Sequence, residues 1–221
     1  MLRGLFVTGT GTGVGKTVVS AALMCRYRAE VPLRYWKPIQ TGIEQDDDTG
    51  HVGRLAGCEP HELFSPGIRL PRPVSPHLAA ALSGTTIRLN ELLDPIVDAD
   101  DGARWIVEGA GGVLVPINQS EMMIDLIACL GLPVVVATRT SLGTINHTLL
   151  TLEALRRRSL HVAGVVLVGD PNAHNRAAIE SYGHVTIIAE MPCFHPLTAA
   201  ALSSWACAEL DPGRDLLELL K

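Results

Sequence analysis

A run of glycine, threonine and lysine near the start of the chain has the residue types that hold nucleotide phosphates. Residues 9–17 read Gly-Thr-Gly-Thr-Gly-Val-Gly-Lys-Thr, after an apolar run at residues 5–7 and before a stretch that suits a helix. Glycines let backbone N–H groups turn inward around an anion, and a helix start adds partial positive charge. The lysine can reach the terminal phosphates, and the last hydroxyl can bind Mg²⁺. The sequence therefore predicts a phosphate loop formed by Thr12, Gly13, Val14, Gly15, Lys16 and Thr17.

This loop departs from the regular pattern at one position. Thr10 stands where the usual motif has its first glycine, and the nearest earlier glycine is Gly9. The alternative interpretation is a hairpin turn rich in glycine and threonine. The position between an expected strand and an expected helix favours phosphate binding.

Lys37 and an acidic run follow the next expected strand. A lysine directly after a strand end points toward a ligand site if the sheet is parallel, although a solvated loop lysine is the alternative. Residues 46–48 are three aspartates before a helix-like stretch, and such a run is usually a solvated loop with a helix cap. The sharper hypothesis is that one of them, with Asp48 preferred, reaches a metal ion at the phosphates.

Glu108 ends another apolar strand and is followed by Gly-Ala-Gly-Gly at residues 109–112. In proteins with a phosphate loop, an acid at the end of a buried strand is a usual metal ligand. The alternative is a surface glutamate before a flexible turn. Because Mg²⁺ prefers a few hard oxygens together with phosphate and water, Thr17, Asp48 and Glu108 form a chemically sensible set.

Small hydroxyl residues and glycine also precede an expected helix at residues 138–147. This segment could bind an anion at the helix start, although an ordinary cap is commoner. His147 is interpreted as a structural residue. The other histidines lack metal-ligand spacing, and no Gly-x-Ser-x-Gly nucleophile elbow occurs.

Alternating elements are needed to bring these residues together. We expect strands at residues 5–7, 34–36, 105–107, 134–137, 162–168 and 185–188. We expect helices at residues 16–29, 49–56, 76–82, 89–97, 124–130, 145–157, 176–182 and 197–208. This alternation predicts an α/β fold of the P-loop type, with a mostly parallel sheet, helices on both faces and one domain over residues 1–221. Residues 58–74 contain four prolines and are expected to be a surface excursion.

Composition narrows the class of protein. The formal net charge is −5, and the longest basic block is the triplet at residues 156–158, so neither nucleic acid nor an anionic membrane is expected as a partner. Hydrophobic residues make up 47% of the chain without a membrane-spanning run, and we expect no signal peptide before the first strand. The five cysteines are far apart, and we expect buried free thiols in a reduced cytoplasm.

The chain resembles the dethiobiotin synthetase family over nearly its whole length. The shared motifs are Phe-Val-Thr-Gly-Thr at residues 6–10, Val-Gly-Lys-Thr at 14–17, Lys-Pro at 37–38, Thr-Gly at 41–42, Ser-Pro-His at 75–77, Val-Glu-Gly-Ala-Gly-Gly at 107–112 and Leu-Gly-Thr-Ile-Asn-His at 142–147. The resemblance implies closure of a ureido ring on 7,8-diaminononanoate with CO₂ or bicarbonate, ATP and Mg²⁺, giving dethiobiotin, ADP and phosphate. A carbamate and its mixed anhydride with phosphate are the implied intermediates.

The same resemblance implies roles for individual residues. Lys16 and Lys37 would act on the transferring phosphoryl group, Lys37 also on the carbamate, and Thr17, Asp48 and Glu108 would hold Mg²⁺. The substrate residues would be Thr41, Gly111, Gly143, Thr144 and Asn146. Family members are homodimers, and the substrate carboxylate would lie near residues 143–146 of the partner subunit.

Two departures from the family concern the nucleotide. Gly13 occupies a loop position where some members carry an acid. Many members read adenine with an Asn-Asp pair after the fifth strand, whereas residues 168–172 here are Val-Gly-Asp-Pro-Asn, so only backbone at Gly169 is expected to contact the base. The rival functions are a related P-loop amide-forming synthetase and a regulatory or partitioning ATPase. The first usually carries a glutaminase domain, and the second a signature lysine where Gly11 stands.

Overall fold

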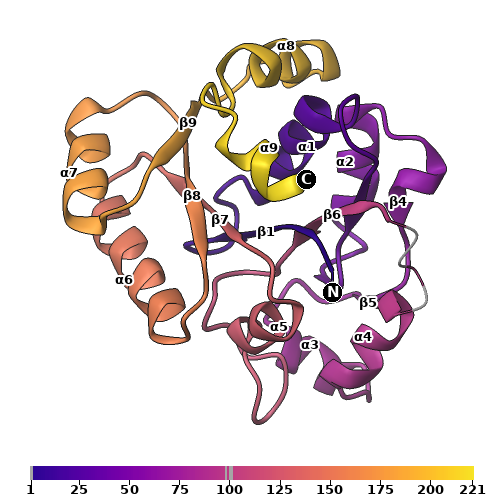
Figure 1. Cartoon of the computed structure of the whole chain (residues 1–221). Coiled ribbons are helices and arrows are strands. Elements are labelled where there is room, and N and C mark those ends of the chain that lie inside the picture. The colour runs from indigo at the N-terminus through magenta and orange to yellow at the C-terminus, as the bar shows by residue number, and fades with distance from the viewer. Residues whose placement is uncertain (1, 98, 100–101) are drawn as a thin grey trace.

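Strands and helices alternate along the chain in the computed structural model, which describes residues 2–97, 99 and 102–221 (Figure 1). The strands are β1 (Gly4–Gly9), β2 (Leu33–Trp36), β3 (Ile39–Thr41), β4 (Leu63–Phe64), β5 (Ile68–Leu70), β6 (Arg104–Glu108), β7 (Val134–Arg139), β8 (Val162–Val168) and β9 (Ile187–Met191). The helices are α1 (Lys16–Tyr27), α2 (Asp48–Ala56), the 3₁₀ helix η1 (Pro60–Glu62), α3 (Pro76–Leu82), α4 (Leu89–Val97), α5 (Met123–Leu130), α6 (Thr144–Arg157), α7 (Ala173–Gly183), α8 (Ala199–Glu209) and α9 (Asp215–Leu220).

Seven strands form one sheet in the order β4-β2-β6-β1-β7-β8-β9. Every pairing in it is parallel, as the alternation of elements predicts. Parallel strands bring all their carboxyl ends to one edge of the sheet. The segments after β1, β2 and β6 therefore meet at that edge, which is where the sequence placed its candidate residues.

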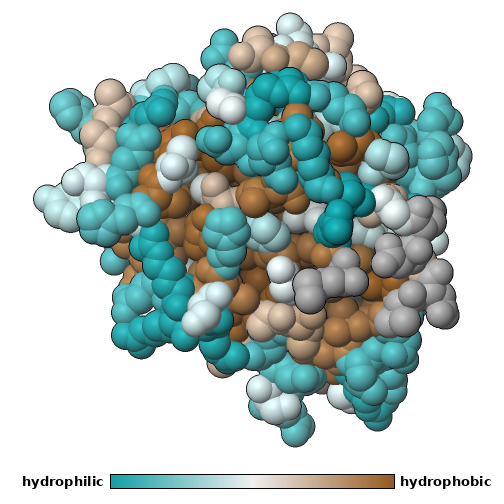
Figure 2. Space-filling view, viewed as in Figure 1, coloured by the Kyte–Doolittle hydropathy of each residue, from teal (hydrophilic) through white to brown (hydrophobic). Residues whose placement is uncertain are grey.

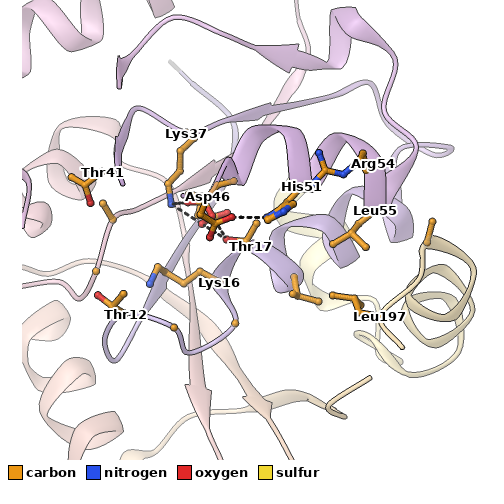
Figure 3. Close-up of a pocket in the computed structure, with 18 residues that line it drawn as sticks. Thr12, Lys16, Thr17, Lys37, Thr41, Asp46, His51, Arg54, Leu55 and Leu197 are labelled. Carbon is orange, nitrogen blue, oxygen red and sulfur yellow. Dashed lines mark hydrogen bonds and ion pairs between the residues drawn. The ribbon is translucent and has the colours of Figure 1, made fainter. Parts of the chain in front are cut away.

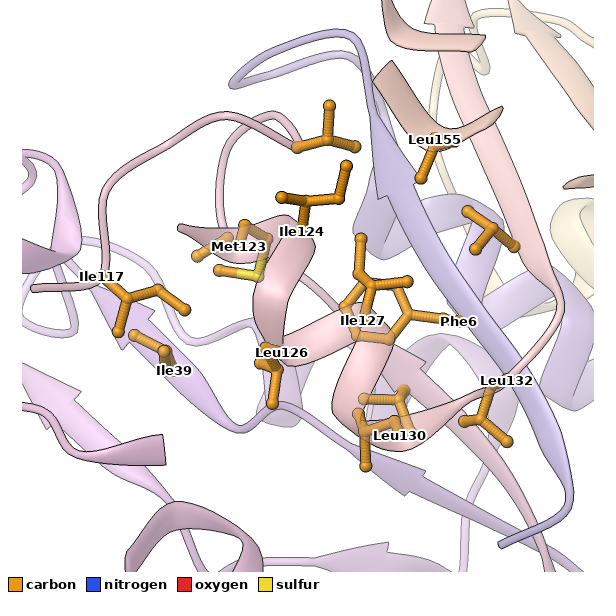
Figure 4. Packing of buried hydrophobic residues seen from close by; sticks show 14 of the residues in the cluster. Phe6, Ile39, Ile117, Met123, Ile124, Leu126, Ile127, Leu130, Leu132 and Leu155 are labelled. Carbon is orange, nitrogen blue, oxygen red and sulfur yellow. The ribbon is translucent and has the colours of Figure 1, made fainter. Parts of the chain in front are cut away.

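Helices cover both faces of this sheet and bury alternate residues of its strands. Leu5 and Val7 share a cluster with α1, α8 and α9, whereas Phe6 points to the opposite face and packs near Ile127 of α5 (Figure 4). In Figure 2, polar side chains predominate around the outline of the molecule, while apolar ones show mainly near its middle, over the sheet. This is the arrangement expected when a parallel sheet is buried on both sides.

The segment at residues 58–74 differs from the expected surface excursion. It contributes η1, the strand β4 beside β2 at the sheet edge, and β5, which pairs in parallel with β3 in a separate two-stranded sheet. Leu70 is buried, and Pro66 accepts a hydrogen bond of 2.6 Å from the indole of Trp36. Its two strands have only two or three residues, which are too few to show the alternation of apolar and polar residues typical of a strand. The prediction of a loop therefore rested on the four prolines.

Two further elements near the carboxyl terminus differ from the prediction. β9 begins at Ile187 and ends at Met191, so the expected strand at residues 185–188 was placed too early. Helix α9 was not predicted. Its start is fixed by Asp211, whose carboxylate accepts hydrogen bonds from the backbone N–H groups of Asp215 and Leu216 at 3.0 and 2.9 Å.

The cysteines are less buried than expected. Cys25 and Cys58 are partly buried, whereas Cys129, Cys193 and Cys207 are exposed. All five thiols are free, which agrees with the expected lack of a disulfide. Apolar neighbours in the sequence misled the prediction because these three residues lie on the outer sides of their elements or in a loop.

Candidate active site

A cavity of about 740 Å³ lies at the carboxyl edge of the main sheet, where the sequence-predicted residues converge (Figure 3). The predicted residues that line it are Thr12, Gly13, Gly15, Lys16, Thr17, Lys37, Thr41, Asp48, Glu108 and Gly111. They come from the phosphate loop, α1, α2 and the ends of β2, β3 and β6. These predicted residues thus converge on one cavity, at the sheet edge that the strand-end rule indicates.

The phosphate loop places Lys16 at the start of α1. Gly15 adopts φ 97° as the residue before the helix, a conformation that favours glycine. The Lys16 ammonium is buried and donates a hydrogen bond of 2.7 Å to the Gly11 carbonyl, and it forms no ion pair with any residue that the structure describes. Burial, and secondarily the charge of Lys37, lower the pKa of Lys16 to about 8. A buried cation without a counter-charge is suited to receive an anionic ligand.

Lys37 lies between two carboxylates. Trp36 pairs with Val107 in the β2–β6 register, so Lys37 and Glu108 come side by side at the strand ends. The Lys37 ammonium is 2.7 Å from Glu108 Oε1 and 2.7 Å from Asp48 Oδ2, and it donates to the Gly109 carbonyl at 3.0 Å. Burial by itself would lower the pKa of Lys37, but the charges of Glu108 and Asp48 outweigh it and raise that pKa. Lys37 is therefore a buried cation held in place by two carboxylates.

Only one of the three consecutive aspartates reaches this centre. Asp48 begins α2, and its Oδ1 accepts a hydrogen bond of 2.8 Å from the Thr17 hydroxyl. Burial would raise the pKa of Asp48, but Lys37 and the hydrogen bonds from Lys37 and Thr17 hold it below its ordinary value. Asp46 instead forms an exposed ion pair with His51 at 2.9 Å, and Asp47 is exposed. The geometry thus selects Asp48 within the acidic run.

The Thr17 hydroxyl oxygen lies at a distance from Asp48 and from Glu108 that suits neighbouring ligands of Mg²⁺. In an octahedral shell with bonds of about 2.0–2.1 Å, neighbouring oxygens lie about 2.9 Å apart. Thr17 Oγ1 is 2.8 Å from Asp48 Oδ1 and 3.0 Å from Glu108 Oε1. Among the described residues no cluster of three His, Cys, Asp or Glu side chains could hold a metal ion. A cation here would therefore complete its shell with phosphate oxygens and water.

A second cavity, of about 630 Å³, adjoins the other side of the phosphate loop; we call it the base-side cavity. It shares Gly13 and Gly15 with the first cavity and is also lined by Val14 and Gly169. Gly169 has φ 135°, and a Cβ added there would lie 2.4 Å from the Thr140 hydroxyl. Because backbone and Thr140 fill this corner, the position accepts only glycine without rearrangement.

The predicted substrate residues divide into two groups. Thr41 and Gly111 line the first cavity. Gly143, Thr144 and Asn146 lie at the start of α6 and line neither cavity. Thr144 is buried, and its hydroxyl is 3.2 Å from that of Thr138. Thr138 in turn lies 3.1 Å from the Thr10 hydroxyl, so Thr144 approaches the start of the loop from behind and not from either cavity.

Comparison with known proteins identifies the family of the chain. A profile described as an AAA domain matches residues 3–201. The ATP-dependent dethiobiotin synthetase BioD of Paramagnetospirillum magneticum is 48% identical over 202 residues, which are 91% of this chain and 94% of that protein. The chain belongs to the dethiobiotin synthetase family.

Two further matches to the dethiobiotin synthetase chain concern a longer protein and a likeness of fold. The biotin biosynthesis bifunctional protein BioCD of Bordetella avium is 47% identical over 205 residues, which make up 92% of this chain and 42% of that longer protein. The septum site-determining protein MinD of Pyrococcus horikoshii superposes over all of this chain and 95% of its own, with a TM-score of 0.57 at 14% identity. That likeness concerns the fold alone and confirms the predicted P-loop α/β class. The identity to dethiobiotin synthetases decides against the two rival functions.

Two features of this dethiobiotin synthetase site escaped the sequence analysis. Tyr35, in the middle of β2, is fully buried and donates a hydrogen bond of 2.9 Å to Glu108 Oε2. His51 and Arg54 line the cavity from α2. Tyr35 lies two residues before Lys37, so strand alternation could have placed both side chains on one face, but an aromatic residue in an apolar strand resembles core.

No described helix of this family member has both the length and the apolar character needed to cross a membrane.

Proposed function

We propose that the chain is an ATP- and Mg²⁺-dependent ligase that closes the ureido ring of dethiobiotin on 7,8-diaminononanoate. CO₂ supplies the ring carbonyl, and ADP and phosphate are the other products. The relatives named ATP-dependent dethiobiotin synthetase, at 41–48% identity over most of the chain, support this reaction. The whole chain, residues 1–221, would act as one P-loop synthetase domain.

The chemistry requires three bond-forming steps. One substrate amine attacks CO₂ and loses a proton, giving a carbamate. A carbamate oxygen then attacks the γ-phosphorus, and the bond to the bridging oxygen of ADP breaks. Finally the second amine attacks the carbamoyl carbon, loses a proton and expels phosphate. Phosphoryl transfer of this kind depends on positioning and charge neutralisation more than on covalent help from the protein.

The residues of the first cavity suit these needs. Lys16 would neutralise the transferring phosphoryl group, and Lys37 would hold the carbamate and the γ-phosphate in line. Thr17, Asp48 and Glu108 would hold Mg²⁺, which when bound neutralises charge on the phosphate oxygens. Thr12, Gly13, Val14 and Gly15 would offer backbone N–H groups, and Gly169 would contact the base through its backbone. Thr41 and Gly111 would contact the substrate.

Gly143, Thr144 and Asn146 lie outside the chain's own cavity, so we propose that they serve the cavity of a second subunit. A homodimer would then bind the substrate carboxylate at the start of α6, where the helix dipole favours an anion. We propose the cytoplasm as its location because ATP and the diamine are consumed there.

One observation carries the proposal: Lys37 stands between Asp48 and Glu108 in the same cavity as the phosphate-loop lysine. Lys37 is a second buried cation in this cavity, and it can hold an anionic co-substrate beside the nucleotide phosphates. Its place beside the metal-binding oxygens suits a nucleophile that must be anionic until it attacks phosphorus.

Isotope transfer tests the proposed chemistry. We expect bicarbonate labelled with ¹⁸O, given with ATP and the diamine, to yield labelled phosphate as well as labelled dethiobiotin in mass spectra. The label reaches phosphate only if a carbamate oxygen attacks the γ-phosphorus. Dethiobiotin formed with unlabelled phosphate would overturn the anhydride route, and the lack of any dethiobiotin would overturn the function. Bicarbonate must be freshly mixed, because exchange with water removes the label.

A further inference from the structure

Two fully buried tyrosines each donate their hydroxyl to a carboxylate, but in different parts of the fold. Tyr27, near the end of α1, donates to Asp211 in the turn before α9. Tyr35, in β2, donates to Glu108 Oε2 at 2.9 Å. Burial is the first cause that raises the pKa of both phenols, so both are neutral donors at working pH. Comparing the two tyrosines therefore separates the effect of a buried hydroxyl on stability from its effect on the active site.

Strand geometry places Tyr35 next to the active-site residues. Side chains alternate along a strand, so Tyr35 and Lys37 emerge on the same face of the sheet. Tyr35 pairs with Ile106 across β2 and β6, and Glu108 lies two residues further along the same face. Two side chains from the β2 segment therefore lie next to Glu108. Lys37 is directly beside it, and Tyr35 is two residues earlier on the same face.

The two oxygens of Glu108 have separate partners. Oε1 faces the Lys37 ammonium at 2.7 Å and the Thr17 hydroxyl at 3.0 Å. Oε2 accepts from Tyr35. Glu108 has no exposed surface, so water cannot replace a lost donor at low cost. Without the Tyr35 hydroxyl, Oε2 would be unsatisfied, and the carboxylate would turn to share its other donors.

We propose that Tyr35 is a positioning residue, whose hydroxyl fixes the rotation of Glu108 so that Oε1 faces the metal and phosphate site. The proposal deepens the proposed function and rests on it for the identity of the reaction. Hydrogen-bond partners of this kind orient ligating carboxylates, and their loss typically lowers metal affinity about 10–100-fold. The role belongs to Tyr35 rather than to Tyr27, although both are equally buried.

The experiment compares Tyr35→Phe with Tyr27→Phe, because each substitution keeps the ring and removes one buried hydroxyl. Mn²⁺ serves as the metal probe, and its affinity for the protein–ADP complex is measured by electron paramagnetic resonance. The Mg²⁺ concentration for half-maximal phosphate release and the melting temperature are measured on the same samples. We expect Tyr35→Phe to weaken Mn²⁺ binding about tenfold and to raise the Mg²⁺ requirement in proportion. Tyr27→Phe should leave both within twofold while lowering the melting temperature.

Equal Mn²⁺ affinity in Tyr35→Phe and the wild type would overturn the proposal. So would an equal loss in both variants, or a Tyr35→Phe protein that fails to fold while Tyr27→Phe folds, because the hydroxyl would then serve stability alone. If the wild type releases no phosphate with the diamine, the proposed function fails. The Mn²⁺ comparison still decides the role of Tyr35 in that case, because it does not depend on turnover.

Discussion

The two cavities beside the phosphate loop are built from different parts of the chain. The first is lined by charged side chains from several elements, and its Lys37 contacts both Asp48 and Glu108. The base-side cavity is lined mainly by residues at and just after the ends of β7 and β8, and at Gly169 a side chain would collide with Thr140. We propose that selectivity resides in the charged cavity, where the phosphate chemistry would occur, and that the base-side cavity has only to admit a flat ring.

The largest effect is expected for Lys37→Met, because Lys37 is the cation between the two carboxylates. Ring closure should fall about a thousandfold, as when a charge-stabilising group is removed from a transition state. Two carboxylates would also lose their buried counter-charge, which should lower the free energy of unfolding by about 3 kcal/mol. Turnover and urea unfolding measure both effects. Near-normal turnover would remove Lys37 from the chemistry and erase the contrast between the cavities.

The second-largest effect is expected at Asp48, and the two preceding aspartates provide matched controls. Asp48→Asn should lower turnover about a hundredfold and raise the Mg²⁺ requirement, because one of the proposed ligand oxygens loses its charge. Asp46→Asn and Asp47→Asn should remain within twofold of the wild type, since neither carboxylate reaches Thr17 or Lys37. A larger loss in Asp47→Asn than in Asp48→Asn would contradict the geometry of α2.

Much of the charged cavity follows from the sequence because local rules suffice there. A phosphate loop lies between a strand and a helix, and the parallel sheet aligns Lys37 with Glu108. Which aspartate of residues 46–48 reaches Lys37 depends on the residue at which α2 begins. Sequence patterns leave the start of a helix uncertain by a residue or two. Tyr35 escaped notice because its polar contact depends on a neighbouring strand. The short β3 and β5, which carry Thr41 into the cavity, have too few residues for a pattern.

The base-side cavity was harder to predict because the segments that line it, after β7 and β8, carry no phosphate- or metal-binding motif. The sequence showed that the usual Asn-Asp pair is missing around Gly169, but not why. Thr140, from the loop after the neighbouring β7, fills the space that a side chain at position 169 would need. Likewise, the role proposed for Gly143, Thr144 and Asn146 requires a second subunit, which lies beyond any rule for a single chain.

An intermediate effect should come from pH, through Lys16. In the free protein the pKa of Lys16 is about 8, so raising the pH above that value removes the proton that binds phosphate. Bound phosphate holds the proton, and the dissociation constant for ATP without divalent metal should therefore rise about tenfold per pH unit above 8. Calorimetric titration between pH 7 and 9.5 measures this. Lys16→Arg, which stays charged, provides the control, and a flat wild-type curve would contradict the assignment.

The smallest effect concerns the base. Because no side chain at position 169 can read the ring edge, ATP, GTP and CTP should support ring closure with kcat/KM values within about tenfold of one another. Steady-state rates with each nucleotide test this. A preference for ATP above a hundredfold would mean that the base-side cavity discriminates as strongly as the charged one, and the comparison would fail.

The most direct test of the account is phosphate release from ATP, measured with the diamine and bicarbonate together and with each alone. In the proposed reaction, the charged cavity couples ATP cleavage to a carbamate that only the two substrates together can form. We therefore expect rapid release in the complete mixture and only background release when either is left out. Equal release without the diamine would contradict the central claim and leave a nucleotide hydrolase on a related fold.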